Sequence, residues 1–274
     1  SLEASAQLAD GAGQAQIDAQ RLDGPEGVFS IAASYGGGGT PALSLDLDIR
    51  EAEGGIAATL LSLPGAPAIE LTVQGEGPLD AFAADIRLAS DGAERLAGRV
   101  ALDGVEDGRR FDVDLRGDVT ELFAPRYKAF FGDDVGLVAR GLQGDDGSLS
   151  LDALDLSTQA LTLSGSARLG PDGWPVFIDI EGAVESADGT PVLLPTADNV
   201  TLRAADLKLA LDGSESDNWT LDLTMRELNH PQVVLGDGAI RASGLISRDG
   251  GRVSAATAMI EAALNQLTLT DPAL

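Results

Sequence analysis

The feature of this 274-residue sequence that most constrains its fold is an alternation of apolar and polar side chains with a period of two. Between residues 43 and 49, Leu or Ile occupies every odd position and Ser or Asp every even one. Successive side chains of a β-strand point to opposite faces, so this segment has one apolar and one charged face. One-sided strands are typical of antiparallel sheets, because parallel sheets are usually buried on both faces.

The same alternation recurs along the chain and predicts an all-β fold. At roughly 8 to 12 residues per strand and turn, we expect a long antiparallel meander of about 16 to 18 strands. We expect the apolar members of these strands to line one face of the sheet. They are Leu43, Leu45, Leu47, Ile49, Phe82, Ile86, Leu88, Phe111, Val113, Leu115, Leu161, Leu163, Val176, Ile178, Ile180, Leu207, Leu209, Leu221 and Leu223.

The punctuation between strands agrees with this pattern. Eleven Asp-Gly pairs occur, most of them between two alternating runs. Asp-Gly suits the two positive-φ positions of a type I′ hairpin turn, so we expect hairpins at these pairs. The alternation also changes phase near Asp152 and again between Leu202 and Leu207. A β-bulge at each place would keep one face apolar and bend the strand.

One segment departs from the period of two. Residues 120–132 carry four of the chain's eleven aromatic residues at near-helical spacing. We predict a short amphipathic helix over about residues 119–131, ended by Gly132 and lying on the apolar face; docking of a partner is the alternative. Its apolar residues are Leu122, Phe123, Tyr127, Phe130 and Phe131. Residues 60–67 predict a loop or helical turn.

Composition excludes several classes of function. The chain has 18 Lys and Arg against 44 Asp and Glu, a net charge of −26, which argues against binding nucleic acid through a basic face. The absence of Cys excludes disulfides and zinc–thiolate sites. No apolar run is long enough to span a bilayer and no signal peptide is evident, which fits a mature chain, a cytosolic chain or an internal section of a longer one.

The candidate catalytic groups are few. Asp46 with Asp48, and Asp112 with Asp114, place two carboxylates on one strand face, as a glycosidase pair or calcium ligands would. An acidic outer face produces the same spacing. His230, the single histidine, precedes a proline and is expected in a loop. We therefore predict no enzyme activity, no metal site and no cofactor.

An apolar face repeated on every strand must be buried against something. A sandwich or barrel would pack two such faces together, but sandwich cores usually hold aromatic side chains, and only 4% of this chain is aromatic. A sheet curved lengthwise into a U-shaped gutter would instead enclose an aliphatic groove. At about 4.8 Å between strands, about 17 strands would stack to roughly 80 Å, a track rather than a pocket.

Several segments resemble a known family. They are residues 67–80, 82–88 and 96–100, then 122–132, 161–169 and 172–175. Their style is similar to that of the TamB / AsmA-like family, inner-membrane-anchored periplasmic proteins of Gram-negative bacteria, in its alphaproteobacterial form. The resemblance covers residues 40–185 well and the remainder by style, and it includes no catalytic signature.

The resemblance implies a folded-over sheet (β-taco) forming one continuous module over residues 1–274, as an internal fragment of a longer protein. It implies that phospholipid acyl chains move along a hydrophobic groove between the inner and outer membranes. It also implies an outer-membrane TamA-like barrel protein as partner in membrane-protein assembly, and a periplasmic location. The alternative is an extracellular adhesin or β-solenoid scaffold, although a solenoid should show a fixed internal period.

Overall fold

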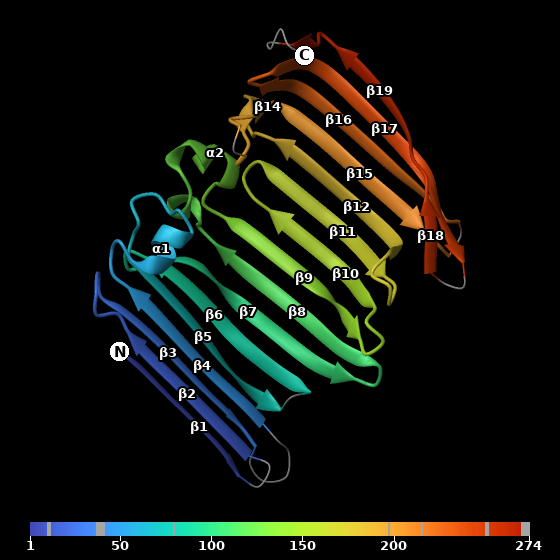
Figure 1. Cartoon of the computed structure of the whole chain (residues 1–274). Helices are drawn as coiled ribbons and strands as arrows, with labels where there is room; N and C mark the ends of the chain where they lie inside the picture. The colour runs from blue at the N-terminus through green and yellow to red at the C-terminus, as the bar shows by residue number, and fades with distance from the viewer. Residues whose placement is uncertain are drawn as a thin grey trace. The chain divides into compact units, whose positions relative to one another are not determined.

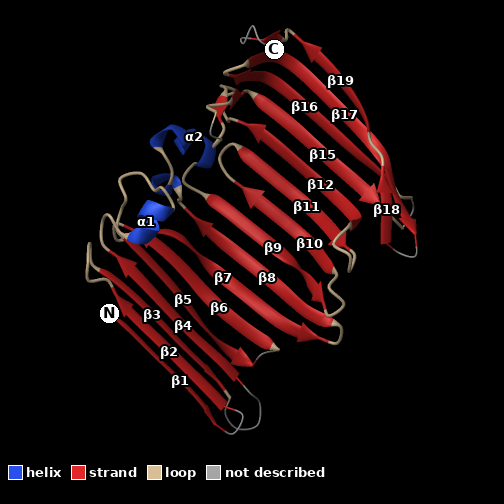
Figure 2. Cartoon of the chain, viewed as in Figure 1, coloured by secondary structure: helices blue, strands red, loops and turns tan. Residues whose placement is uncertain are grey.

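The computed structural model describes residues 1–269 except 10–11, 37–41, 79, 197, 215 and 250–251. The fold is all-β, with 68% of the chain in strands (Figures 1 and 2). The strands are antiparallel and the sheet is curved and does not close, which confirms the predicted fold class at this level. Chain contacts divide the molecule into two compact units, Ser1–Pro125 and Arg126–Leu274.

The first unit is a meander in which each strand pairs with the next one along the chain. Its strands are β1 (Leu2–Ala9), β2 (Ala12–Gln20), β3 (Gly27–Tyr35), β4 (Ala42–Glu51), β5 (Ile69–Pro78), β6 (Ala81–Ser90), β7 (Ala93–Val105) and β8 (Gly108–Gly117). A short helix, α1 (Ile56–Leu60), lies in the β4–β5 connection, and a 3₁₀ turn, η1 (Thr120–Leu122), follows β8.

The second unit begins with a 3₁₀ turn, η2 (Pro125–Tyr127), and the helix α2 (Lys128–Phe131). Its longer strands are β9 (Val135–Gly144), β10 (Leu149–Ser157), β11 (Leu161–Leu169), β12 (Pro175–Glu185), β15 (Ala204–Asp212), β16 (Asn218–His230), β17 (Val233–Asp249) and β19 (Met259–Asn265). They pair in that order. The shorter strands are β13 (Val192–Leu193), β14 (Thr201–Leu202), β18 (Arg252–Ala256) and β20 (Thr268–Leu269).

The described residues form 20 strands, more than the predicted 16 to 18. The excess comes from β13, β14 and β20, which have two residues each. Two residues cannot show an alternation, so a pattern with a period of two does not detect such strands.

The Asp-Gly pairs do not all form the predicted turn. Asp91 and Gly92 have φ of 50° and 75°, as a type I′ hairpin requires, and they join β6 to β7. The pairs at 103–104 and 237–238 lie inside β7 and β17, where the prediction of a turn is wrong. Both pairs stand directly opposite residues of the neighbouring strands, and this pairing overrides the local turn preference.

Three further Asp-Gly pairs form a different turn. At Gly147, Gly173 and Gly189 only the glycine has positive φ, and the preceding Asp does not. Each Asp carboxylate instead accepts the backbone N–H two residues further on, at 2.9 to 3.1 Å. An Asx turn of this kind replaces the second positive-φ residue, so the β9–β10 and β11–β12 hairpins form without the type I′ geometry. The turn at Asp188 connects β12 to β13, which pair with other strands.

The two predicted bulges have different outcomes. In β10 the register shifts between Leu151 and Leu154 against both neighbouring strands, which confirms the first. At the second place the strand breaks at Arg203, which separates β14 from β15. The predicted bulge is absent, because β14 and β15 pair with β16 in one register, and the Arg203 N–H donates to the Arg226 carbonyl of β16 at 3.1 Å. Only the partner on the other side changes, from β13 to β12.

The predicted helix over residues 119–131 is wrong as a single element. The segment forms η1, η2 and α2, interrupted at Phe123, whose φ of −120° and ψ of 163° are extended. Pro125 is the physical reason, because the residues before a proline are disfavoured in the helical region. Gly132 ends α2 with a φ of 67°, as predicted. The helical turn expected at residues 60–67 lies slightly earlier, at α1.

Candidate functional site

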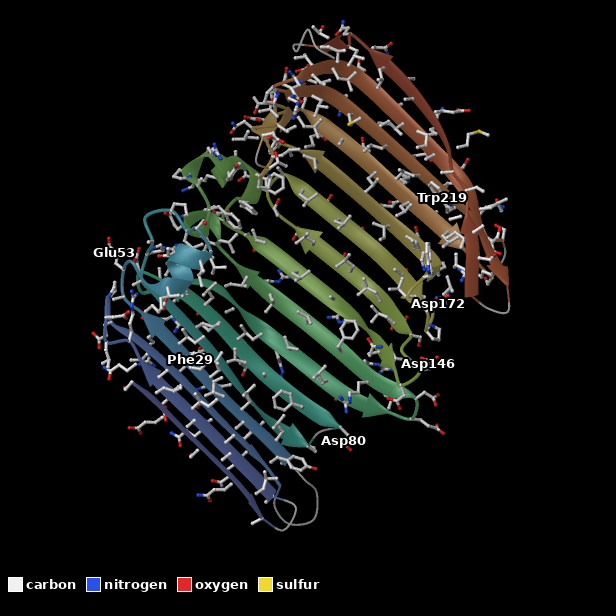
Figure 3. All side chains as sticks on the ribbon, in the orientation of Figure 1. Phe29, Glu53, Asp80, Asp146, Asp172 and Trp219 are labelled. Atoms are coloured by element: carbon white, nitrogen blue, oxygen red, sulfur yellow. The ribbon has the colours of Figure 1, made fainter. Side chains whose placement is uncertain are left out.

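The register of the first unit joins the apolar side chains into continuous rows. Directly opposed residues of an antiparallel pair lie on the same face. One row runs from Ile17 on β2 through Ile31, Leu47 and Val73 to Ile86 on β6. Beside it, Phe29 pairs with Ile49, Ile49 with Leu71 and Leu71 with Leu88. Phe29 is labelled on β3 in Figure 3. The apolar face is therefore continuous across the unit.

The second unit repeats this arrangement. One row consists of Leu137, Leu156, Leu163, Gly182, Leu207, Leu223 and Ile240. The next consists of Ala139, Leu154, Gly165, Ile180, Leu209, Leu221 and Ala242. Glycines interrupt both rows. At Gly165 φ is +150° and an added Cβ would meet the Asp179 carbonyl at 2.1 Å, so no larger residue fits there.

The opposite face of each unit is polar and charged. In the first unit Asp85 pairs with Arg99 and Arg99 with Asp114 across β6, β7 and β8. In the second unit the Lys208 ammonium lies 2.6 Å from the Glu181 carboxylate on the neighbouring strand. The two faces thus differ completely in chemistry, as the sequence alternation predicts.

All nineteen residues predicted to line the apolar face are half-buried. None belongs to the fifteen fully buried apolar residues of the described chain. Most of these residues stand directly opposite an apolar residue or glycine of the neighbouring strand, and each retains part of its surface exposed to solvent. Val176 stands beside the register shift where β12 meets the end of β11. Within each unit the apolar face is therefore partly exposed, in contrast to the closed core of a sandwich.

The prediction missed further residues of the same face. They are Ile17, Phe29, Ile31, Leu71, Val73, Leu96, Val100, Leu102, Leu137, Val184, Trp219, Ile240, Ile260 and Leu264. The same period of two could have found most of them. Alanine and glycine beside them weaken the pattern in the single sequence.

A helical cover lies over one end of the face in the first unit. Glu51 pairs with Ile69 two positions beyond the pair Ile49–Leu71, so both lie on the apolar side of the sheet. The Glu51 carboxylate accepts the backbone N–H of Ala57 in α1 at 2.6 Å. Ala58 is fully buried and Ile69 is 4% exposed. The α1 segment therefore covers the end of the apolar rows.

In the second unit α2 has the equivalent position. Phe130 is 6% exposed and forms a buried cluster with Ala160 and Val192. Leu161, a predicted lining residue, packs against this cluster, as does Phe131. The α2 segment therefore contacts Leu161, at one end of the apolar rows.

The remaining aromatic-segment residues separate by position. Tyr127 is buried, its hydroxyl donates to the Thr196 carbonyl at 3.1 Å, and the Arg126 guanidinium lies over its ring. Leu122 is half-buried, whereas Phe123 is 39% exposed. The break before Pro125 thus turns Phe123 outward while its neighbours pack inward.

The apolar face of the first unit contains a shallow apolar hollow at the ends of its rows remote from α1. It has a volume of about 470 Å³ and is lined mainly by Ala6, Leu8, Ala15, Ala33, Tyr35 and Leu43. These residues continue the rows described above. An aliphatic ligand would find there a pocket with few hydrogen-bonding groups.

The candidate catalytic carboxylates form no such site. Asp48 pairs with Arg50 at 2.6 Å, and Asp114 lies 3.7 Å from Arg116. They lie on the polar face, where a hollow of about 710 Å³ is lined by both negatively charged carboxylates and positively charged guanidinium groups. Within the described residues, no cluster of three or more His, Cys, Asp or Glu could hold a metal ion.

His230 is the last residue of β16, where it pairs with Val233 and is half-buried, so the expectation of a loop residue is wrong. Its Nδ1 accepts the backbone N–H of Gln232 at 3.1 Å, and its Nε2 lies 3.9 Å from an Asp198 carboxylate oxygen. The imidazole therefore shapes the β16–β17 turn and has no nucleophile within reach among its described contacts.

Four side chains have shifted pKa values. Hydrogen bonds from the Thr190 hydroxyl and N–H and from the Ser186 hydroxyl lower the pKa of Asp188 to about 2, and bonds from Ser148 lower that of Asp146. Hydrogen bonds to carboxylates raise the pKa of Lys208, through Glu181, and of Arg203, through Glu227. Asp146, Asp188 and Lys208 are exposed, at turns or on the polar face, and Arg203 is half-buried at a strand break. None of the four groups with a shifted pKa is placed on the apolar face, which offers contact with hydrocarbon.

A scan against family models, a search of curated proteins and a search of solved structures each find no match to this chain. In the described part of the chain, no helix is both long and apolar enough to span a membrane.

Proposed function

We propose that the apolar face binds phospholipid acyl chains and that the chain is a module of a TamB / AsmA-like lipid conduit. The observation that supports this most directly is the row of half-buried Leu, Ile and Val side chains continued from strand to strand in each unit. These side chains still expose apolar surface to water, and bound acyl chains would cover that surface.

The energetics suit transfer. Moving a 16-carbon tail fully out of water gains roughly 12 kcal/mol at about 0.8 kcal/mol per methylene, an upper bound. Because neighbouring rows present similar aliphatic side chains, a tail that moves from one row to the next loses little of this energy. A lining without specific polar contacts therefore permits movement along the sheet.

The proposal includes a lengthwise U-shaped gutter with the apolar face inside. Bulges and glycines bend strands, and the bulge in β10 lies opposite Gly165 of β11.

We also propose a location and a partner. As part of an inner-membrane-anchored protein, the chain would work in the periplasm between the two membranes. A TamA-like outer-membrane barrel protein would be its partner, through parts of the protein outside this chain, in assembling outer-membrane proteins. No catalytic role is proposed.

The test is native mass spectrometry and solvent extraction of the purified chain, with matched variants on one strand. Leu163→Glu places a charge on the apolar face of β11, whereas Thr162→Glu places the same charge on its exposed polar face. We expect co-purified phospholipid on the parent chain and on T162E, and at least about a tenfold lower occupancy on L163E because a carboxylate is costly beside hydrocarbon.

A lipid-free parent chain that also refuses added fluorescent phospholipid would contradict the proposal and favour an adhesin-type scaffold. Equal lipid loading in L163E and T162E would contradict it as well, since binding would then not use the apolar face. Circular dichroism of both variants verifies that the sheet is retained.

A further inference from the structure

The outward side of the α1 segment carries three exposed aliphatic side chains. Ile56 is 51%, Leu60 78% and Leu61 68% exposed. Ile56 and Leu60 are four residues apart on α1 and therefore share a helix face, and Leu61 follows directly. We call these three residues the aliphatic knob. Large apolar side chains gathered at one place on a surface indicate an interaction site more strongly than scattered ones.

The chain around the knob contains no charge. Residues 56–69 form fourteen consecutive uncharged positions in a protein of which 23% is charged. The nearest charged residue before them is Glu53, which is labelled beside α1 in Figure 3. The segment has neither a basic residue to contact phosphate nor a carboxylate to be buried at a cost.

Several backbone N–H groups of the segment are bonded within the loop, and that of Ala57 is bonded to the Glu51 carboxylate. The N–H groups of Thr59, Leu61, Ser62, Leu63 and Ala66 donate to carbonyl oxygens of residues 55 to 63 at 2.9 to 3.2 Å. Pro64 and Pro67 have no N–H to satisfy. The Thr59 hydroxyl also donates to the Gly55 carbonyl, at 2.7 Å. Unsatisfied backbone groups are what excludes most loops from hydrocarbon, and these donors are already bonded.

The segment is also held in one shape. The Gly54 N–H donates to the Ala66 carbonyl at 2.8 Å and closes the base of the loop. Ser62 and Ala66 have φ of 54° and 44°, left-handed values that a non-glycine residue keeps only where its surroundings impose them. The knob is therefore presented ready for contact, with little ordering cost.

We propose that the aliphatic knob inserts into the surface of a zwitterionic phospholipid bilayer. The knob has aliphatic side chains and lacks the Trp, Tyr and Arg that dominate protein–protein contacts. A net charge of −26 disfavours an anionic membrane, so a neutral surface suits it best. This inference rests on the proposed function, because α1 covers the end of the apolar face and an acyl chain leaving the bilayer there has a short path to the lining.

The experiment is co-flotation of the chain with phosphatidylcholine vesicles. We compare the parent chain with L60S/L61S, and with L245S/L269S as a control that removes two leucines of 47% and 48% exposure in the second unit. We expect L60S/L61S to reduce binding at least about tenfold, given the transfer energy of two Leu side chains, and the control to bind as the parent does. Added phosphatidylglycerol should weaken binding by the parent.

Insertion itself is measured with L61W. Vesicles containing brominated phosphatidylcholine should quench its additional tryptophan emission, over the signal from Trp174 and Trp219 in the parent. Unchanged flotation of L60S/L61S, or no extra quenching in L61W, would overturn the inference. So would a knob variant that changes only sedimentation, since the knob would then join two copies of the chain.

These outcomes separate the two proposals. An L60S/L61S chain that retains co-purified phospholipid but does not float supports both the lining and the knob. A chain that floats through the knob but holds no lipid on its apolar face overturns the proposed function and leaves bilayer contact established.

Discussion

The two helical covers, α1 and α2, solve the same problem in different ways. Both lie over an end of an apolar face. α2 does so with a large aromatic side chain, Phe130, buried among Ala160 and Val192. α1 does so with a small one, Ala58, and is attached by the Glu51 carboxylate. A cover can therefore be held either by burial of an aromatic ring or by close backbone approach and a polar bond.

The difference has a consequence for the outward surfaces. In α2 the large apolar residue points inward, whereas in α1 the large residues Leu60 and Leu61 point outward. The aromatic cover is self-contained, and the aliphatic cover has its main apolar area free to contact something else. We therefore expect α2 to contribute mainly to the stability of the fold and α1 to contact with another surface.

The largest effect is expected from Phe130→Ala. Removal of a buried phenyl ring leaves a cavity and typically costs about 3 to 5 kcal/mol, so urea unfolding should show a large loss of stability. Phe123→Ala is the matched control, because Phe123 is 39% exposed, and should cost less than about 1 kcal/mol. Similar losses in both variants would show that α2 is not anchored through Phe130.

A smaller effect is expected from Glu51→Ala. The variant removes the acceptor of the Ala57 N–H and should reduce the unfolding free energy by about 1 kcal/mol, as for loss of a helix cap. Glu51→Gln keeps an acceptor oxygen and should restore part of that energy. Hydrogen exchange of the Ala57 amide follows the bond directly. Full protection of this amide in E51A would mean that α1 is held without the carboxylate.

The smallest effect concerns the turn before Val192, a member of the α2 cluster. Asp188 has a folded-state pKa of about 2, lowered from 3.8 chiefly by Thr190. Because the carboxylate is held more strongly in the folded state, it stabilises the fold at pH values above its ordinary pKa. This stabilisation is lost as the pH falls from about 4 towards 2. Unfolding curves of the parent and of Asp188→Asn should therefore converge over that range. A constant difference between them at every pH would contradict the assignment.

Much of the architecture follows from the sequence. The alternation at Leu43 to Ile49 and its repeats predicts antiparallel strands with one apolar face, and all nineteen predicted lining residues are half-buried. The phase change at Asp152 predicts the β10 bulge. These features are local, because the two faces of a strand are set by its own period.

Other features depended on partners distant in the sequence. The Asp103-Gly104 pair has turn chemistry but lies in β7, since pairing with β6 and β8 outweighs it. The break of the aromatic segment before Pro125 has instead a local cause, because a proline disfavours a continuous helix. α1 has no aromatic residue to signal a cover, and its attachment to Glu51 needs the β4–β5 register.

By itself, then, the sequence determined which side chains share a face, since alternation is a property of a single strand. Only the tertiary structure decided which side chains stand opposite one another and what covers the ends of the rows. Cross-strand register places Ile49 beside Leu71 and Glu51 beside Ile69, and thereby positions α1 over the apolar end. The physical reason is that the free energy of strand pairing and burial comes from contacts among many strands, so no single segment of the sequence determines it.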